Sequence, residues 1–286
     1  MLNFLSHLLL NSNLINMPIK VPLLLLSVSI IFISSVLSSC QTSSTQAANE
    51  TETRETPVVT KEFVSIFDGE SLSGWEGDPD YWRVENGAIV GEITPEKPLP
   101  ANSFLIWQDG TPEDFELKAE FRISESGNSG INYRSERLDT IPFALRGYQA
   151  DIDGRNRYTG QNYEERKRTT LAYRGQKTVV SSPDEPDASG GLRAHIEKNA
   201  WQPTEVVASL GESDSLKTHI KQEDWNEIHL VIKGNRLQHY VNGVLMSDVT
   251  DEDQQNLAME GRLGLQVHRG PPMKVEYRNI KVMIED

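Results

Sequence analysis

The chain is poor in cysteine and in basic residues. Of its 286 residues only one, Cys40, is a cysteine, so no disulfide can form within the chain and stabilise the fold. Lys and Arg number 28 against 42 Asp and Glu, which gives a formal net charge of −14. Such an acidic chain argues against nucleic acid as a partner, because phosphates require clustered Lys and Arg. Neutral or polar small substrates are compatible with this charge.

The N-terminal part of the chain has the pattern of an export signal. Residues 21–37 are almost all apolar or small, Lys20 precedes them, and small residues follow before Cys40. The ending Leu37-Ser38-Ser39-Cys40 resembles a bacterial lipobox. The resemblance implies cleavage before Cys40, acylation of its thiol and attachment to a membrane. A transmembrane anchor is the alternative interpretation of the apolar run, and Met17 is an alternative start.

These features predict a three-part chain. Residues 1–39 form a lipoprotein signal peptide, and residues 40–60, rich in Ser, Thr, Gln, Ala and Glu, form a flexible linker. Residues 61–286 form the folded domain. We expect the mature protein in the bacterial cell envelope, lipid-anchored in the periplasm or at the outer membrane.

The folded part has the pattern of an all-β protein. Short runs of alternating apolar and polar residues follow one another, separated by Gly and Asn turn signals, with at most one short helix between about 194 and 215. Asn86-Gly87 predicts a hairpin within 81–91, and Trp225 to Met246 predicts a three-stranded meander. A single β-sandwich of two large antiparallel sheets is the simplest fold for this pattern.

The segment Gly147 to Gly154 is the most informative strand. Side chains alternate along a strand, so Tyr148, Ala150 and Ile152 can pack in a core. The other face then carries Gln149, Asp151 and Asp153, an amide and two carboxylates in a row. A purely structural strand has no need of such a face, which therefore predicts a site on the sheet.

Two more strands and one polar segment offer similar side chains. Alternation places Asn132 with Arg134 on one strand face, and Gln266 with His268 on another. The polar stretch 158–168 is predicted to be a loop over the sheet, and it carries Tyr163, Glu165 and Arg166. Glu164 and Glu165 are adjacent, so only one of them can readily face the sheet.

Several motifs in the right order resemble the 3-keto-disaccharide hydrolase family, formerly a domain of unknown function. The motifs are Ile66 to Trp75, Asn128 to Ile131 with Arg134, Gly147-Tyr148-Gln149, Trp225-Asn226, Asn242-Gly243, Gly264 to His268 and Tyr277 to Ile280. The resemblance covers roughly residues 62 to 284 and implies a concanavalin-A-like jelly roll, often lipid-anchored. Many members carry Glu in place of Gln149 and Gln in place of Asp151.

The resemblance also implies a substrate, a glycoside oxidised to a ketone at carbon 3 of its sugar. The ketone acidifies the proton on carbon 2, so a base can remove it and expel the aglycone from carbon 1, after which water adds. Candidate bases are Asp151, Asp153 and His268, Arg134 could hold the enolate, and Tyr163 could act as the acid. Hydroxyl-binding candidates are Asn132, Gln149, Gln266, Glu165 and Arg166. No cofactor is predicted.

Alternatives stay open at this point. The domain could bind carbohydrate without catalysis, since lectins share the fold. Asp153 could merely cap a turn, and Arg134 could pair structurally with Asp151. Asp151 and Asp153 would lie about 6 to 7 Å apart, a separation that suits ordinary glycoside hydrolysis. Carboxylates and imidazole could hold a metal, but no ligand spacing demands one, and none is predicted.

Overall fold

A computed structural model describes residues 62–183, 201 and 203–285. Contacts divide the chain into two units, Met1–Thr56 and Pro57–Asp286, and all the described residues belong to the second. The predicted signal peptide, the linker up to residue 60 and Cys40 lie outside the described residues. Within the described part, no helix has both the length and the apolar character needed to cross a membrane.

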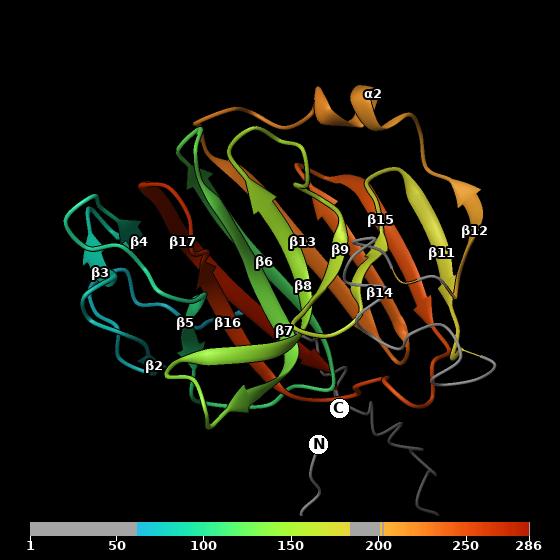
Figure 1. Cartoon of the computed structure of the whole chain (residues 1–286), viewed down its shortest axis with the longest axis horizontal. Helices are drawn as coiled ribbons and strands as arrows, with labels where there is room; N and C mark the ends of the chain where they lie inside the picture. The colour runs from blue at the N-terminus through green and yellow to red at the C-terminus, as the bar shows by residue number, and fades with distance from the viewer. Residues whose placement is uncertain (1–61, 184–200, 202, 286) are drawn as a thin grey trace, which may run out of the picture. The chain divides into compact units, whose positions relative to one another are not determined.

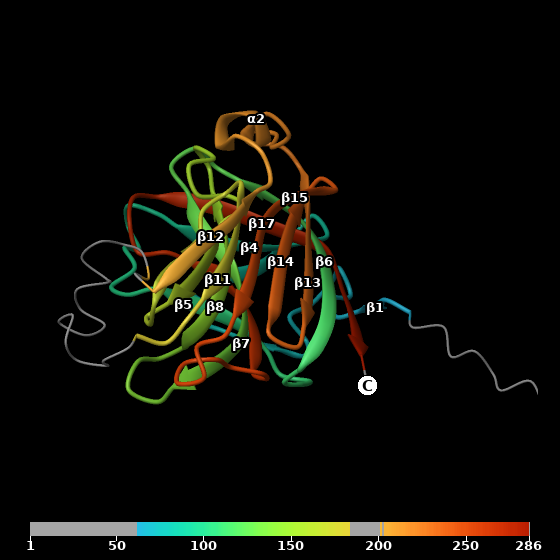
Figure 2. The ribbon, with the colours of Figure 1, turned by 90° about the vertical axis from the view of Figure 1, so that its right-hand side faces the viewer.

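The domain consists of two sheets packed face to face (Figure 1). The larger has ten strands in the order β12-β11-β15-β14-β13-β6-β17-β4-β3, with β1 paired to β17 beside this path. Its strands are β1 (Val64–Ser65), β3 (Trp82–Glu85), β4 (Ala88–Ile93), β6 (Asp114–Ile123), β11 (Gln176–Val180), β12 (Thr204–Ser209), β13 (Asn226–Lys233), β14 (Arg236–Val241), β15 (Val244–Asp251) and β17 (Met273–Glu285). Figure 2 shows β6, β13 and β14 as one layer and β5, β7 and β8 as the other.

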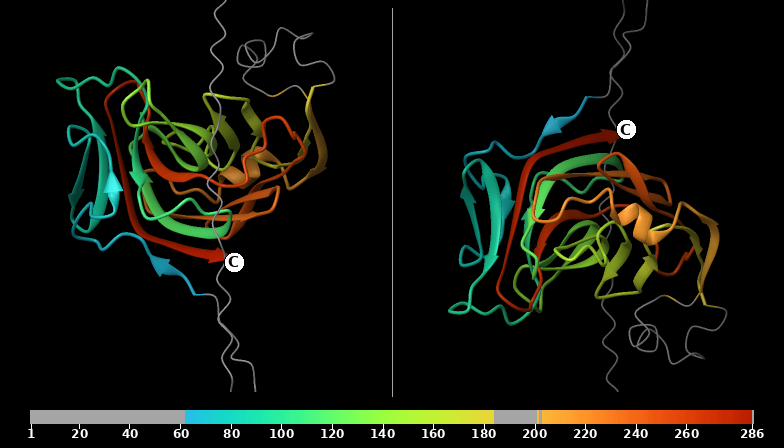
Figure 3. Two further views of the ribbon diagram at one scale, coloured as in Figure 1. Left: turned by 90° about the horizontal axis from the view of Figure 1, so that it is seen from below. Right: turned by 90° about the horizontal axis from the view of Figure 1, so that it is seen from above.

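The smaller sheet has seven strands in the order β10-β9-β8-β7-β16-β5-β2. They are β2 (Trp75–Glu76), β5 (Ser103–Trp107), β7 (Asn128–Leu138), β8 (Ala144–Asp153), β9 (Asn162–Glu165), β10 (Thr169–Ala172) and β16 (Arg262–Val267). The chain crosses repeatedly between the sheets. Strands β4 and β6 belong to the larger sheet and β5 and β7 to the smaller, and later β16 of the smaller sheet lies in sequence between β15 and β17 of the larger. Both sheets curve, and the long strand β17 bends around the domain (Figure 3). The predicted jelly-roll sandwich is therefore confirmed.

The core lies between the sheets and follows the predicted alternation. Tyr148, Ala150 and Ile152 of β8 are fully buried in it. Tyr133 of β7 stacks on Tyr148 and forms a 2.9 Å hydrogen bond with His239 of the larger sheet. The opposite face of the smaller sheet is thus the one left for a site.

Most strand predictions are confirmed and some are wrong. The hairpin β3–β4 turns at Asn86 and Gly87, both left-handed (φ 52° and 76°), and the meander is β13–β14–β15. A short helix, α2 (Ser213–Lys217), begins inside the region of about 194–215 where one was expected and ends two residues beyond it. The loop predicted over 158–168 is wrong in part, because Asn162–Glu165 pairs with β8 as β9. Strands β10, β11 and β12 were not predicted, and β11 pairs parallel with β15.

Candidate functional site

A cavity of about 190 Å³ opens on the outer face of the smaller sheet. It is lined by side chains of β7, β8 and β9, the loop before β9 and the end of β16: Asn128, Gln149, Asp151, Tyr158, Gln161, Tyr163, Glu165 and His268. Five residues predicted for the site, Gln149, Asp151, Tyr163, Glu165 and His268, therefore share one cavity.

Asp151 is the central carboxyl group of this cavity and is only 7% exposed. The side-chain amide of Gln149 donates to its Oδ1 at 2.6 Å, and that of Gln161 donates to its Oδ2 at 2.5 Å. Burial raises the pKa of Asp151 to about 7, the two amide donors oppose the rise, and the nearby carboxylates of Glu165 and Asp153 add to it. Asp151 can thus exchange a proton near neutral pH.

Gly130 creates the space that Gln149 needs to reach Asp151. It lies on β7 opposite Asp151, and a Cβ atom there would come within 2.6 Å of the Gln149 Cγ atom. Gln266 on β16 donates to the Gln149 Oε1 atom at 2.9 Å, which orients the amide so that its nitrogen faces Asp151. The relay from Gln266 through Gln149 to Asp151 is therefore a fixed feature of the sheet.

Strand β9 presents Tyr163 and Glu165 to the cavity and turns Glu164 toward the interior. Tyr163 pairs with Gln149 across the strands, and burial raises the pKa of its phenol, which stays protonated at neutral pH. Glu164 is fully buried and binds the guanidinium of Arg168, which also contacts Asp251 and Asp253. The expectation that only one of the paired glutamates faces the sheet is confirmed.

His268 follows β16 at the rim of the cavity. Its Nδ1 atom lies 2.8 Å from the carbonyl oxygen of Arg269, so Nδ1 carries a proton and donates it. The other ring nitrogen, Nε2, is left to act on a ligand. Asn102 holds this rim in place, because it donates to Glu165 Oε1 at 2.9 Å and accepts from the backbone N–H of Arg269 at 2.9 Å.

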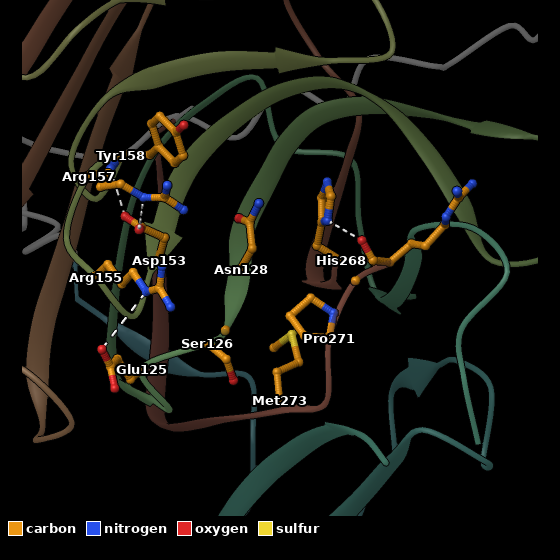
Figure 4. Close-up of a pocket in the computed structure, with 13 residues that line it drawn as sticks. Glu125, Ser126, Asn128, Asp153, Arg155, Arg157, Tyr158, His268, Pro271 and Met273 are labelled. Atoms are coloured by element: carbon orange, nitrogen blue, oxygen red, sulfur yellow. Dashed lines mark hydrogen bonds and ion pairs between the residues drawn. The ribbon is translucent and has the colours of Figure 1, made fainter. Parts of the chain in front are cut away.

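A second cavity, of about 270 Å³, adjoins the first (Figure 4). The two share Asn128, Tyr158 and His268. The rest of its lining comes from the turn before β7, the end of β8 with the loop after it, and the loop from β16 to the start of β17: Glu125, Ser126, Gly127, Asp153, Arg155, Arg157, Arg269, Gly270, Pro271 and Met273. His268 thus lies where the two cavities meet.

Asp153 belongs to this second cavity and holds a loop. Its Oδ1 atom accepts the backbone N–H groups of Tyr158 at 2.7 Å and Thr159 at 3.1 Å. Asp153 therefore caps a turn through its Oδ1 atom, as one of the two interpretations of the sequence expected. Its Oδ2 atom is buried and receives no hydrogen bond from a described residue; the Nε atom of Arg157 lies 3.8 Å away.

The placement of Arg134 on the polar face is wrong. Its guanidinium donates to the carbonyl oxygens of Glu113 and Gly234 and pairs with Asp114 at 3.0 Å, not with Asp151. The cause is a register shift after Tyr133, with a left-handed φ of 43° at Arg134, which interrupts the alternation of the strand. Arg134 is a structural residue that ties β7 to the larger sheet.

Three further candidates lie near the cavity without lining it. Asn132 and Gln266 are fully buried, so the expectation that they bind sugar hydroxyls is not met; Gln266 instead supports Gln149. Arg166 lines a third cavity, of about 440 Å³, together with Ala101, Asn102, Glu165, His268 and Arg269. Its Nε atom lies 3.5 Å from the Oε1 atom of Glu165.

Gln161 and Tyr158 also line the cavity, although neither was predicted as a site residue. Both lie in the stretch predicted as a loop, and the signal available was its density of amides and aromatics beside an acidic strand. Among the described residues, no three His, Cys, Asp or Glu side chains are grouped as a metal site. The donor set of the cavity is therefore one of carboxylates, amides, a phenol and an imidazole.

Comparison with known proteins assigns the domain to a family. A 24% identical 3-keto-disaccharide hydrolase from Bacteroides thetaiotaomicron aligns over 257 residues, 84% of each chain. Two solved structures from Bacillus subtilis resemble the domain: the carbohydrate-binding module CBM66 (15% identity, 73% of this chain and 95% of that one, TM-score 0.45) and a protein with a galectin-like fold (9% identity, 74% and 90%, TM-score 0.46). The family model for a 3-keto-alpha-glucoside-1,2-lyase-like domain matches residues 62–283, and the chain belongs to that family.

Proposed function

We propose that this protein cleaves the glycosidic bond of 3-keto-glycosides by elimination followed by hydration. The family membership and the named activity of the Bacteroides relative support a carbohydrate-directed enzyme. The observation that carries the proposal is the buried Asp151, with a pKa of about 7, in one cavity with Tyr163 and His268. Ketone-assisted removal of a carbon-bound proton needs such a base.

The reaction begins when Asp151 takes the proton from carbon 2. The electrons of that C–H bond form an enolate, whose charge lies on the oxygen of carbon 3. The enolate then restores the ketone and forms a double bond between carbons 1 and 2, while the bond from carbon 1 to the aglycone oxygen breaks. That oxygen takes a proton from Nε2 of His268, which enters the cycle as the imidazolium, with Nδ1–H still donating to the carbonyl oxygen of Arg269. Water adds to carbon 1 and returns a proton to His268. Asp151, whose carboxyl proton exchanges with solvent after the aglycone departs, protonates carbon 2, so glycoside and water become 3-keto sugar and free aglycone.

The remaining side chains have supporting roles in this scheme. Tyr163, kept protonated by burial, donates a hydrogen bond to the developing enolate oxygen. Gln149 and Gln161 hold the carboxylate of Asp151 in place and limit the rise in its pKa. Glu165 and Asn128 are available for hydroxyl groups of the ring.

The test uses 3-keto-glucosides incubated with the protein in D₂O. Elimination and hydration put deuterium on carbon 2 of the released sugar, whereas ordinary glycoside hydrolysis leaves that position unchanged. We expect cleavage with deuterium at carbon 2, and loss of cleavage in Asp151→Asn. Binding without cleavage would instead favour a carbohydrate-binding module, and cleavage without deuterium would favour two-carboxylate hydrolysis.

We further propose that the enzyme is lipid-anchored in the bacterial cell envelope through Cys40. The motif Leu37-Ser38-Ser39-Cys40 behind an apolar run supports this. Cells expressing the full chain and supplied with labelled palmitate should label the wild type and leave Cys40→Ser unlabelled. An unlabelled wild type would end the proposal without affecting the enzymatic one.

A further inference from the structure

The arginines of this domain fall into two groups. Most guanidinium groups donate hydrogen bonds to a carboxylate or a carbonyl oxygen, as those of Arg83, Arg122, Arg134, Arg137, Arg146, Arg168, Arg174, Arg236, Arg262 and Arg278 do. Within the described ranges, the guanidinium groups of Arg155, Arg157, Arg166 and Arg269 donate none. All four line the two cavities that flank the Asp151 cavity.

Three of these arginines line the cavity of Figure 4, which Arg155 and Arg157 border on one side. The ionic contacts of Arg155 and Arg157 are long: the Nε atom of Arg155 lies 3.9 Å from Oε1 of Glu125, and the Nε atom of Arg157 lies 3.8 Å from Oδ2 of Asp153. Their terminal N–H groups are therefore free to bind a ligand. A guanidinium group is a planar fork whose N–H groups can bind two oxygens of a carboxylate or a sulfate. Arginines are grouped at this cavity although the net charge of the chain is −14.

Asp153 gives the same cavity a buried acceptor. Its Oδ2 atom receives no hydrogen bond from any described residue, although the side chain is only 2% exposed. Burying a charged oxygen without a donor is unfavourable, so a ligand hydroxyl would be a suitable partner. The cavity thus offers an acceptor for a hydroxyl beside the donors of Arg155 and Arg157.

The position of this cavity relates it to the reaction. It shares His268 with the Asp151 cavity, and in the proposed scheme His268 protonates the oxygen of the leaving group. A sugar ring over Asp151 would therefore extend its aglycone past His268 into the cavity of Figure 4. The aglycone must accordingly match the chemistry found there.

We infer that the cavity of Figure 4 is the leaving-group subsite and that it selects an anionic sugar as aglycone. The carboxylate of a uronic acid, or the sulfate of a sulfated sugar, binds Arg155 and Arg157, and a hydroxyl of the same ring donates to Asp153. This inference rests on the proposed function and adds the substrate class to it.

The experiment compares three 3-keto-glucosides whose aglycones are glucose, glucuronate and glucose 6-sulfate. We expect kcat/KM to be about tenfold or more higher for the anionic pair, as charge-assisted hydrogen bonds would give. Arg155→Ala and Arg157→Ala should each remove several-fold of that preference and change kcat/KM for the glucose substrate less than twofold. The two anionic substrates distinguish carboxylate from sulfate recognition. Arg83→Ala, which removes an exposed charge from the other sheet, is the matched control and should change neither.

A second readout separates this inference from the proposed function. Calorimetric titration of the wild type with free glucuronate and with glucose should show binding of the acid only, lost in Arg157→Ala and kept in Arg83→Ala. If the glucose substrate is cleaved as well as the anionic ones and the arginine variants have no effect, the inference is overturned and the enzyme remains. If none of the three substrates is cleaved but a 3-keto-glucoside still binds at Asp151, the proposed function fails instead.

Discussion

The side-chain amide of Gln149 donates a 2.6 Å hydrogen bond to Oδ1 of Asp151, two residues further along the same strand. The bond exists because Gly130 has no Cβ atom in its path and because Gln266 holds the other end of the amide. A strand face usually presents such side chains side by side to solvent. Here the two are joined into one unit, so the protonation of Asp151 depends on Gln149.

Replacing Gln149 with Met tests that dependence. The donor to Asp151 disappears while the volume is nearly kept, so the pKa of Asp151 should rise further above 7, because burial is then opposed by Gln161 alone. We expect the acid limb of the kcat/KM profile to move to higher pH, with activity at pH 6 falling several-fold. Gln238→Met on β14 of the larger sheet is the control. An unchanged acid limb would mean that Asp151 does not govern it.

The substitution Asp151→Asn should change the stability of the protein as well as its activity. The folded-state pKa of Asp151 is raised from 3.8 to about 7, so folding is favoured by the protonated form, and that contribution is lost as pH rises through about 7. The neutral Asn variant should therefore gain stability over the wild type as pH rises from 4 to 7 and keep the gain above 7. The shift of about 3 pKa units sets an upper limit of about 4 kcal/mol. Urea unfolding at pH 4, 6 and 8 measures it.

The same substitution should abolish turnover, since Asn cannot accept the proton. A variant that unfolds at the same urea concentration as the wild type at every pH would show that burial of the Asp151 carboxylate does not destabilise the folded state. Stability and activity are thus expected to change in opposite directions, as is common where a buried charge serves catalysis.

The sequence predicted those parts of the site that depend on regular alternation. Gln149 and Asp151 share a face because the backbone of β8 follows the period of two. Gly130 and Gln266 acquire their roles only through strand pairing, because they lie far from Gln149 in sequence. Pairing of distant strands cannot be deduced from the pattern of one strand.

Where the backbone leaves regular geometry, the prediction failed. Arg134 is a bulge residue with a left-handed φ, and a single such residue reverses the faces of the residues after it in the strand. Residues 162–165 were predicted as a loop because Tyr163 stands among charged residues with little periodicity. In the structure they form β9, where Tyr163 is partly exposed and Glu164 is buried against Arg168. A buried ion pair makes a core strand look like a solvated one in the sequence.

Arg134→Ala tests the structural role assigned to that arginine. The change leaves the carbonyl oxygens of Glu113 and Gly234 without their guanidinium donor and removes the ion pair with Asp114, which should cost about 3 kcal/mol of unfolding free energy. The melting temperature should fall, while kcat/KM per folded molecule stays within about twofold. Arg134→Lys, a smaller loss, keeps the test usable if the alanine variant does not fold. A stable variant with a large fall in kcat would mean that Arg134 takes part in the reaction.

Tyr163→Phe isolates the contribution of one hydroxyl to the proposed enolate. The ring and its packing beside Gln149 remain, so unfolding free energy should change by less than about 1 kcal/mol. Loss of one donor to a developing oxyanion should lower kcat by about 100-fold with little change in KM, because the charge exists only in the transition state. Tyr240→Phe, on the larger sheet against His229, is the matched control and should keep full activity. The decisive measurement is exchange of the carbon 2 proton with D₂O, followed by NMR on a 3-keto-glucoside. If exchange stays fast while aglycone release slows, Tyr163 acts on the leaving group and not on the enolate; if both stay fast, it takes no part in the reaction.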